Sequence, residues 1–188
     1  MNIHANIPSS VDEFLHWNEG REGKREFVRG RVVEMMVNVS KGHLRIATEV
    51  THQLVSKLGT KNYDIGSADF GVKVAEGVRY PDVLVETFAA NVKALATEQP
   101  IFIAEVLSPS TMAEDFGRKA EDYLGLNSLQ HYLILSQDEI LAWLWSRDEA
   151  SGWSGPVIYD AQSESIALLG LEISLDLHAL YRGIVSAS

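Results

Sequence analysis

The sequence predicts an α+β fold, in which an N-terminal β-hairpin is followed by a helix, several central strands, a second helix and more strands. Three observations predict it. Apolar residues alternate with polar ones on both sides of Arg29-Gly30, as in two strands joined by a tight turn. Residues 40–59 follow the helical period instead, and residues 100–107 (PIFIAEVL) are almost wholly apolar, which is typical of a strand buried on both faces.

Two helices are expected around the hairpin. Ser10-Val11-Asp12-Glu13 matches a capping box and predicts a short first helix. Ser40 is a good N-cap and Gly59 a good stop signal for the long helix between them. The apolar stripe of this long helix is expected to comprise Leu44, Ala47, Leu54, Val55 and Leu58.

The rest of the chain is expected to contain mostly strands. After the long helix, strands are predicted at 63–67, 70–75 and 81–86, followed by an unassigned polar and alanine-rich stretch at 87–99 and the apolar strand 100–107. A second major helix is predicted at about 112–126. The segments HYLILS and ILAWLWS predict two strands turned at Gln137-Asp138, and residues 151–188 should hold short strands and a final helical turn.

Length and composition limit the class of protein. At 188 residues, with 46% hydrophobic residues and 22% charged residues, the chain is expected to form a single domain over 1–188. It has no cysteine and no apolar stretch of the length that a membrane helix needs, so we expect a cytoplasmic protein without a membrane partner. Any metal must then be bound by carboxylate, imidazole or amide groups.

The net charge of −10 argues against nonspecific binding to nucleic acid, because an acidic surface is repelled by phosphates. One short stretch differs from the rest, since it gathers Arg21, Lys24, Arg25, Arg29 and Arg31 around the expected hairpin. Glu22 and Glu26 dilute this positive charge. The stretch is either a local basic surface or simply a solvated hairpin face.

Glu105 is the first candidate functional residue. It stands inside the most apolar predicted strand, on the side expected for Ile101, Ile103 and Leu107. An ionised carboxylate there costs several kcal/mol unless it has an ion partner, a metal or a raised pKa. Alternatively, the strand ends early and Glu105 lies at its wet end, paired with a lysine.

Asp82 is the second candidate, because it follows Pro81 at the opening of another apolar strand. A Pro-Asp pair on its own is more often a turn. If the two strands are neighbours, however, carboxylates about 4 Å apart would repel by roughly 4 kcal/mol, and a divalent cation would remove that repulsion. Oxygen ligands of this kind suit Mg²⁺ or Mn²⁺.

Asp115, Lys119 and Tyr123 recur at a spacing of four residues and therefore share one face of the predicted helix. Lys119 is then able to point toward the two carboxylates, where it would orient or deprotonate a water molecule or offset charge on a phosphate oxygen. The alternative is an exposed stripe in which Asp115 and Lys119 are merely paired.

Taken in order, Pro81-Asp82, EVLSPST (105–111), Asp115, Lys119 and Tyr123 resemble the Uma-two family of putative restriction endonucleases, a branch of the PD-(D/E)XK nuclease superfamily. The resemblance extends upstream to REFVRGRVVEM and to His43, and covers most of residues 10–146. It implies a restriction-endonuclease-like core, in which a mixed β-sheet is flanked by helices. It also implies that Asp82, Glu105 and the Val106 carbonyl are similar to that superfamily's metal ligands. Glu26 and His43 match further positions of the family, although His43 is equally well explained as a solvated residue at a helix start.

One position departs from the superfamily's motif. The usual lysine two residues after the second acid is replaced by Leu107, and Lys119 on the following helix is the candidate to stand in for it. The resemblance implies a Mg²⁺- or Mn²⁺-dependent endonuclease that hydrolyses phosphodiester bonds in DNA. A homodimer is expected, because a duplex offers two strands to cut. The alternatives are a catalytically inactive nuclease-like module for binding or assembly and a hydrolase of small phosphate esters.

Overall fold

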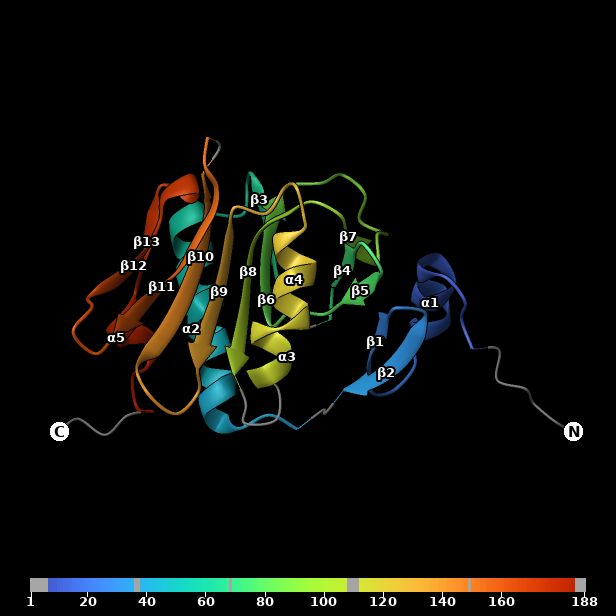
Figure 1. The fold of residues 1–188 in the computed structure, drawn as a ribbon, viewed down its shortest axis with the longest axis horizontal. Coiled ribbons are helices and arrows are strands. Elements are labelled where there is room, and N and C mark those ends of the chain that lie inside the picture. Colours follow the sequence, from blue (N-terminus) through green and yellow to red (C-terminus); the bar gives the residue numbers. More distant parts are fainter. Residues whose placement is uncertain (1–6, 36–37, 68, 108–111, 149, 185–188) are drawn as a thin grey trace, which may run out of the picture.

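The computed structural model describes residues 7–35, 38–67, 69–107, 112–148 and 150–184. Its largest sheet has six strands in the order β11-β10-β9-β8-β6-β3, and only the β8–β9 pair is parallel (Figure 1). The sheet is therefore mixed, as predicted. In spatial order its strands are β11 (Gly152–Asp160), β10 (Leu141–Asp148), β9 (His131–Ser136), β8 (Pro100–Leu107), β6 (Val83–Thr87) and β3 (Tyr63–Ser67).

Strand β8 is the predicted apolar strand, and it lies inside the sheet between β6 and β9. Phe102, Ala104 and Val106 face the core on the α2 side, while Ile103 and Leu107 face the core on the other side. Ile101 was expected to share the side of Glu105, which is wrong: it packs with the α2-side core. The cause is a bulge, because Val85 pairs with Phe102 and Glu86 with Pro100, which leaves Ile101 without a partner on β6.

Helix α2 (Lys41–Leu58) covers one face of the sheet, and its ends were predicted correctly, with Ser40 as N-cap and Gly59 as C-cap. The predicted stripe was partly wrong, because Leu44 is 57% exposed and Val55 38% exposed. Ile46, Val50 and Leu54, spaced by four residues, are the ones that reach the core. No helix in the described part of the chain, α2 included, is long and apolar enough to span a membrane.

We call the core beneath α2 the α2 core. Besides the sheet and α2, it takes in residues of the C-terminal segment, which forms a second, two-stranded sheet and a helical turn. Tyr181 follows that turn, and its hydroxyl donates a hydrogen bond to the Leu141 carbonyl at 2.8 Å. The elements of this segment are β12 (Ser165–Leu168), the 3-10 turn η1 (Leu169–Leu171), β13 (Ile173–Asp176) and α5 (Leu177–Leu180).

The opposite face of the sheet is covered by two short helices rather than by the single helix predicted at 112–126. Helix α3 (Met112–Phe116) and helix α4 (Arg118–Leu124) are separated at Gly117 (Figure 1). A Cβ atom at Gly117 would lie 2.6 Å from the Ala113 carbonyl oxygen, so only glycine permits this break. We call the core beneath these helices the α4 core; it contains Ile103, Leu107, Tyr123 and Tyr132.

A five-stranded sheet in the order β2-β1-β5-β4-β7 forms the other end of the molecule, together with helix α1 (Val11–Asn18) (Figure 1). The predicted hairpin is present, and both turn residues, Arg29 and Gly30, have positive φ. The capping box is only half formed, because Glu13 accepts hydrogen bonds from Ser9 instead of from the Ser10 backbone. The strands are β1 (Lys24–Val28), β2 (Arg31–Met35), β4 (Gly71–Val74), β5 (Gly77–Arg79) and β7 (Ala96–Thr97).

Candidate functional site

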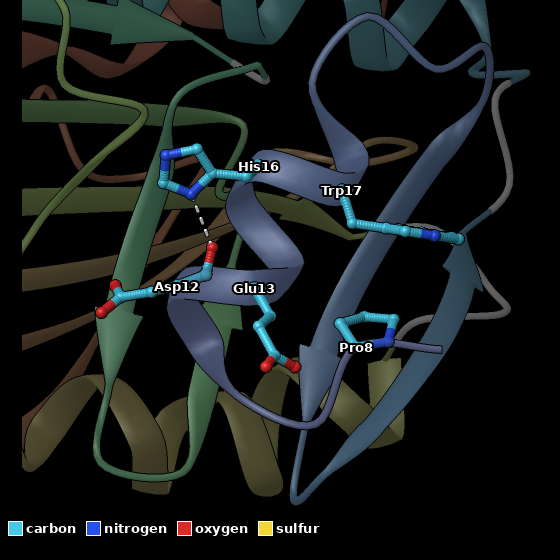
Figure 2. Close-up of a pocket in the computed structure, with 5 residues that line it drawn as sticks. All are labelled: Pro8, Asp12, Glu13, His16 and Trp17. Carbon is cyan, nitrogen blue, oxygen red and sulfur yellow. Dashed lines mark hydrogen bonds between the residues drawn. The ribbon is translucent and has the colours of Figure 1, made fainter. Parts of the chain in front are cut away.

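Two hollows in the described surface differ in what lines them. The smaller, of about 440 Å³, lies beside α1 and is drawn in Figure 2. There the His16 ring bonds the Asp12 carbonyl of its own helix at 2.8 Å, while the carboxylates of Asp12 and Glu13 point to different sides. Nothing converges in it. The larger hollow, a cleft of about 1250 Å³, is lined by Glu26, His43, Asp82, Glu105, Val106, Asp115 and Lys119.

The cleft therefore gathers residues that sequence analysis had selected from five separate segments. Only Tyr123, among the predicted site residues, does not line it, because its ring is buried in the α4 core. The segment 108–111, which completes the EVLSPST motif, lies outside the described residues. Leu107 is buried in the α4 core and so contributes packing rather than charge.

Asp82 is positioned by the end of the β6–β8 ladder. The last backbone pair of this ladder joins Val83 to Ala104. Beyond that pair, the Val106 N–H donates to Oδ2 of the Asp82 side chain at 2.8 Å, so the carboxylate serves as the acceptor at the end of the ladder. The other oxygen, Oδ1, lies 3.1 Å from His43 Nε2 near the start of α2. Burial raises the pKa of Asp82, but the contacts with His43 and the Val106 N–H outweigh it, so the pKa lies below its usual value. Asp82 is thus ionised at neutral pH.

Glu105 lies within β8, which continues to Leu107, and only 3% of the residue is exposed. The alternative of an early strand end is therefore wrong, although the lysine partner that it included is present. Oε1 of Glu105 accepts hydrogen bonds from Lys119 Nζ and from the Tyr123 hydroxyl, each at 3.0 Å. Burial raises the pKa of Glu105 to about 8; Lys119 opposes this rise, and the charges of Asp82 and Asp115 add to it.

Lys119 lies between two acids and is itself buried. Its Nζ is 3.0 Å from Glu105 Oε1 and also 3.0 Å from Asp115 Oδ1, although the second contact is not an aligned hydrogen bond among the described residues. Burial lowers the pKa of Lys119, but the charges of Glu105, Asp115 and Glu26 raise it well above its usual value. The predicted pairing of Asp115 with Lys119 is therefore confirmed. The prediction that the two would lie on an exposed stripe is wrong, because both residues are buried.

Tyr123 contributes a neutral hydroxyl. Burial raises its pKa well above the usual value, so the ring stays protonated and donates to Glu105. It packs against Tyr132 with ring centroids 5.3 Å apart, and the Tyr132 hydroxyl in turn donates to the Asp115 carbonyl at 3.0 Å. This aromatic pair therefore holds both Glu105 and the end of α3 in place through its two hydroxyl groups.

Arg79 is the residue that sequence reasoning missed. It is 2% exposed, and its guanidinium contacts Glu26 at 2.8 Å, Asp122 at 2.7 Å and Glu114 at 3.1 Å. These acids stand on β1, α4 and α3, so one side chain ties the hairpin to both helices. The signal was present in RYPD, where an arginine is placed in an apolar strand just before Asp82, but the three-residue strand β5 was not predicted.

Glu26 is committed to this ion pair. Besides Arg79, its second oxygen accepts the Tyr80 N–H at 3.2 Å, and only 1% of the residue is exposed. Burial alone would lower the pKa of Arg79, but the charges of Glu26 and Asp122 have the larger effect and raise the pKa above its usual value. The guanidinium is therefore permanently charged. In this arrangement Glu26 is held away from a direct role as a metal ligand.

The charges around the site favour a cation. Beside the permanent cations Arg79 and Lys119, six carboxylates surround it, namely Glu26, Asp82, Glu105, Glu114, Asp115 and Asp122. No group of three His, Asp or Glu residues among those described is arranged as a ready metal site. Mg²⁺ nevertheless binds through one or two carboxylates and retained water. Asp82 and Glu105, with the Val106 carbonyl, therefore fit Mg²⁺ or Mn²⁺ as a sparse oxygen donor set.

Comparison with known proteins finds relatives that match most of this chain. The chain resembles the uncharacterized protein slr1290 of Synechocystis sp. PCC 6803, at 28% identity over 93% of this chain and 92% of the relative. A second protein of that organism, the uncharacterized protein sll1609, is 31% identical over 66% of this chain and 73% of its own length.

A solved structure shares the fold. It is the crystal structure of a putative nuclease belonging to DUF820 from Anabaena variabilis, with a TM-score of 0.74 at 15% identity, covering 95% of this chain and all of that one. The mixed α+β architecture is thus restriction-endonuclease-like, as predicted. Residues 11–178 match the Uma2 family, described as "Putative restriction endonuclease". With nearly the whole described chain inside that match, this protein belongs to the Uma2 family.

Proposed function

We propose that this chain is an endonuclease that hydrolyses phosphodiester bonds in DNA with the aid of a divalent cation. The observation that carries the proposal is the convergence of two acids and a lysine from separate elements in one cleft. Lys119 lies 3.0 Å from Glu105, and Asp82 is bonded to Val106, the residue next to Glu105. Membership of the Uma2 family supports the same class of reaction.

Asp82, Glu105 and the Val106 carbonyl are the groups that would hold the cation. Bound there, Mg²⁺ or Mn²⁺ supplies Lewis acidity toward the phosphate and makes a water molecule more acidic. Asp82 is ready for this role because its pKa is already lowered, whereas Glu105 must first lose the proton that burial favours. His43 supports Asp82 by fixing the orientation of its carboxylate.

Lys119 acts as a cation rather than as a base. Because its pKa is raised by the acids around it, it stays protonated over the whole working range of pH. An ammonium group fixed in a cleft stabilises the negative charge that grows on a phosphate oxygen in the transition state. Of the roles considered for Lys119, orientation of water and stabilisation of charge are therefore favoured over deprotonation.

Cleavage of supercoiled plasmid tests the proposal. With Mg²⁺ or Mn²⁺ the wild type should nick or linearise the DNA, and Glu105→Gln, which keeps the shape of the side chain, should reduce the rate at least about 100-fold. Glu86→Gln is the matched control, because Glu86 is an acid of β6, the strand next to β8, and does not line the cleft. Cleavage by Glu105→Gln at the wild-type rate would remove Glu105 from the site.

A second candidate, a nuclease-like module that binds or assembles without cutting, is favoured by one observation. Lys119, Tyr123 and His43 already satisfy oxygens of Glu105 and Asp82 without any metal. Calorimetry with millimolar Mn²⁺ separates the candidates. Heat of binding that is weakened in Glu105→Gln supports the nuclease, whereas no binding by the wild type supports the inactive module.

The homodimer remains a prediction that follows from this function. Two active sites related by a two-fold axis suit the two antiparallel strands of a duplex. The mass of the full chain in solution, measured by light scattering, checks it. A monomer at all concentrations would contradict the expected assembly.

A further inference from the structure

The cleft has a charge balance unlike that of the rest of the chain. Of the 16 Lys and Arg residues in the protein, eight line the cleft, together with eight of the 26 Asp and Glu residues. The remainder of the chain thus has eight cations against eighteen acids. The whole net charge of −10 lies outside the cleft.

The charges within the cleft differ in how far they are buried. Glu26, Glu105 and Asp115 are buried beside Arg79 and Lys119, whereas the acids Glu19, Glu34 and Asp69 are exposed. Five cations belong to the hairpin and to the turn before it, namely Arg21, Lys24, Arg25, Arg29 and Arg31. A sixth, Arg118, is exposed at the start of α4. The cations of the rim therefore come from both the hairpin and the α4 side.

The rim cations are not equally free. Arg29 is paired with Glu76 at 2.9 Å, and Arg25 lies 3.7 Å from Glu34. Arg21 lies over the Trp17 ring at 4.2 Å. Lys24, Arg31 and Arg118 form no ion pair with any of the described residues. In a chain with ten more acids than cations, three uncommitted cations around one cleft are poorly explained as a solvated surface.

We infer that Lys24, Arg31 and Arg118 form a phosphate-binding rim that holds the sugar-phosphate backbone of DNA across the cleft, above Asp82 and Glu105. This inference rests on the proposed function, which supplies the substrate, and adds the surface that binds it. A polyanion approaching elsewhere meets the excess of acids and is repelled, whereas the rim offers its charge without first breaking an internal ion pair. The acidic total therefore directs DNA toward the cleft rather than preventing its binding.

The test is the salt dependence of binding, measured by fluorescence anisotropy with a short labelled DNA duplex. The Glu105→Gln chain is the parent, in Mg²⁺, so that cutting does not disturb the equilibrium. Each of Lys24→Gln, Arg31→Gln and Arg118→Gln should raise Kd several-fold and make the slope of log K against log salt shallower by about 0.9. In the triple variant, the slope should become shallower by nearly three times this amount. Lys61→Gln and Lys93→Gln, exposed cations outside the cleft, should leave both quantities unchanged.

The outcomes separate this inference from the proposed function. Rim variants with the parent's Kd and slope, or loss of binding in Lys61→Gln and Lys93→Gln to the same degree, would overturn the rim. A parent that does not bind the duplex at low salt would overturn it too. Binding that depends on the rim, in a wild type that cuts no DNA with Mg²⁺ or Mn²⁺, would support the rim and refute the nuclease.

Discussion

The two faces of the six-stranded sheet are built from the same strands, but one face is apolar and the other holds buried charges. Along β8, Phe102, Ala104 and Val106 enter the α2 core, where the neighbouring side chains are apolar. The alternate residues enter the α4 core, where Glu105 interrupts the apolar series and contacts Lys119 and Tyr123. Buried charge is costly to maintain, and here it is concentrated on the face that borders the cleft. The comparison teaches that one face provides stability while the other accepts a cost to stability in order to hold charges in place.

The largest expected effect tests the charged face through Arg79. Arg79→Met keeps much of the volume but leaves Glu26 and Asp122 without their cation, so the free energy of unfolding should fall by about 3–5 kcal/mol at pH 7. The loss should shrink in acid, where carboxylates take up protons. Urea unfolding followed by tryptophan fluorescence measures it, with Arg79→Lys as the control that keeps the charge. A loss below about 1 kcal/mol at pH 7 would contradict the role given to Arg79.

The matching test of the apolar face is Leu133→Ala. Leu133 is fully buried in the α2 core, and the cavity left by the substitution should cost about 2–5 kcal/mol. In contrast to Arg79→Met, the loss should be the same at pH 5 and pH 8, because no titrating group is exposed. The same urea titration at the two pH values checks it, and a loss that varies with pH would mean that the two faces are coupled.

Glu105→Gln should have a smaller effect of opposite sign. The raised pKa of Glu105, about 8, means that its contribution to stability is complete below the unfolded pKa and is lost as pH rises through 8. Without divalent cations, the variant should therefore gain about 1–2 kcal/mol on the wild type between pH 5 and pH 9. A rise through three pH units corresponds to about 4 kcal/mol, and the smaller value is expected because the buried site relaxes and admits water when the carboxylate ionises. Thermal unfolding in EDTA measures the difference, and a variant that becomes relatively less stable as pH rises would contradict it.

The smallest expected effect concerns His131, a polar group at the edge of the apolar face. Its ring bonds Ser146 Oγ at 3.0 Å and accepts from the Gly170 N–H at 3.2 Å, and burial lowers its pKa to about 4. A lowered pKa means that its contribution to stability is complete above pH 6.5 and is lost as pH falls toward 4. Wild type should lose on the order of 1 kcal/mol between pH 6.5 and pH 5, relative to His131→Gln. If the free energy of unfolding falls equally in the two proteins over this pH range, His131 is not the cause of the loss of stability.

The parts of the fold that sequence predicts well are those with local signals. The Arg29-Gly30 turn, the caps Ser40 and Gly59, and the apolar run of β8 each depend on neighbouring residues, and each was found where it was expected. The helix break at Gly117 was missed because a single glycine costs a helix only about 1 kcal/mol, so the break depends on the packing around it.

The site was predictable as a set of residues but not as a network. Spacing put Asp115, Lys119 and Tyr123 on one face, and the apolar setting of Glu105 marked it as unusual. That Glu26 would bind Arg79 was not predictable, because the two are far apart in the sequence and meet only through the β1–β5 pairing. Long-range pairings of this kind leave no local pattern for sequence analysis to find.

The hydrogen bond from the Val106 amide to Asp82 has a geometric consequence. Adjacent strands in any sheet lie about 4.8 Å apart, so a carboxylate that closes the β6–β8 ladder has its distance from Glu105 set by the backbone. Repacking of either core would alter how firmly the strands are held, yet leave that spacing nearly constant. Side chains of the interior can therefore diverge between relatives while the separation of the two acids is preserved.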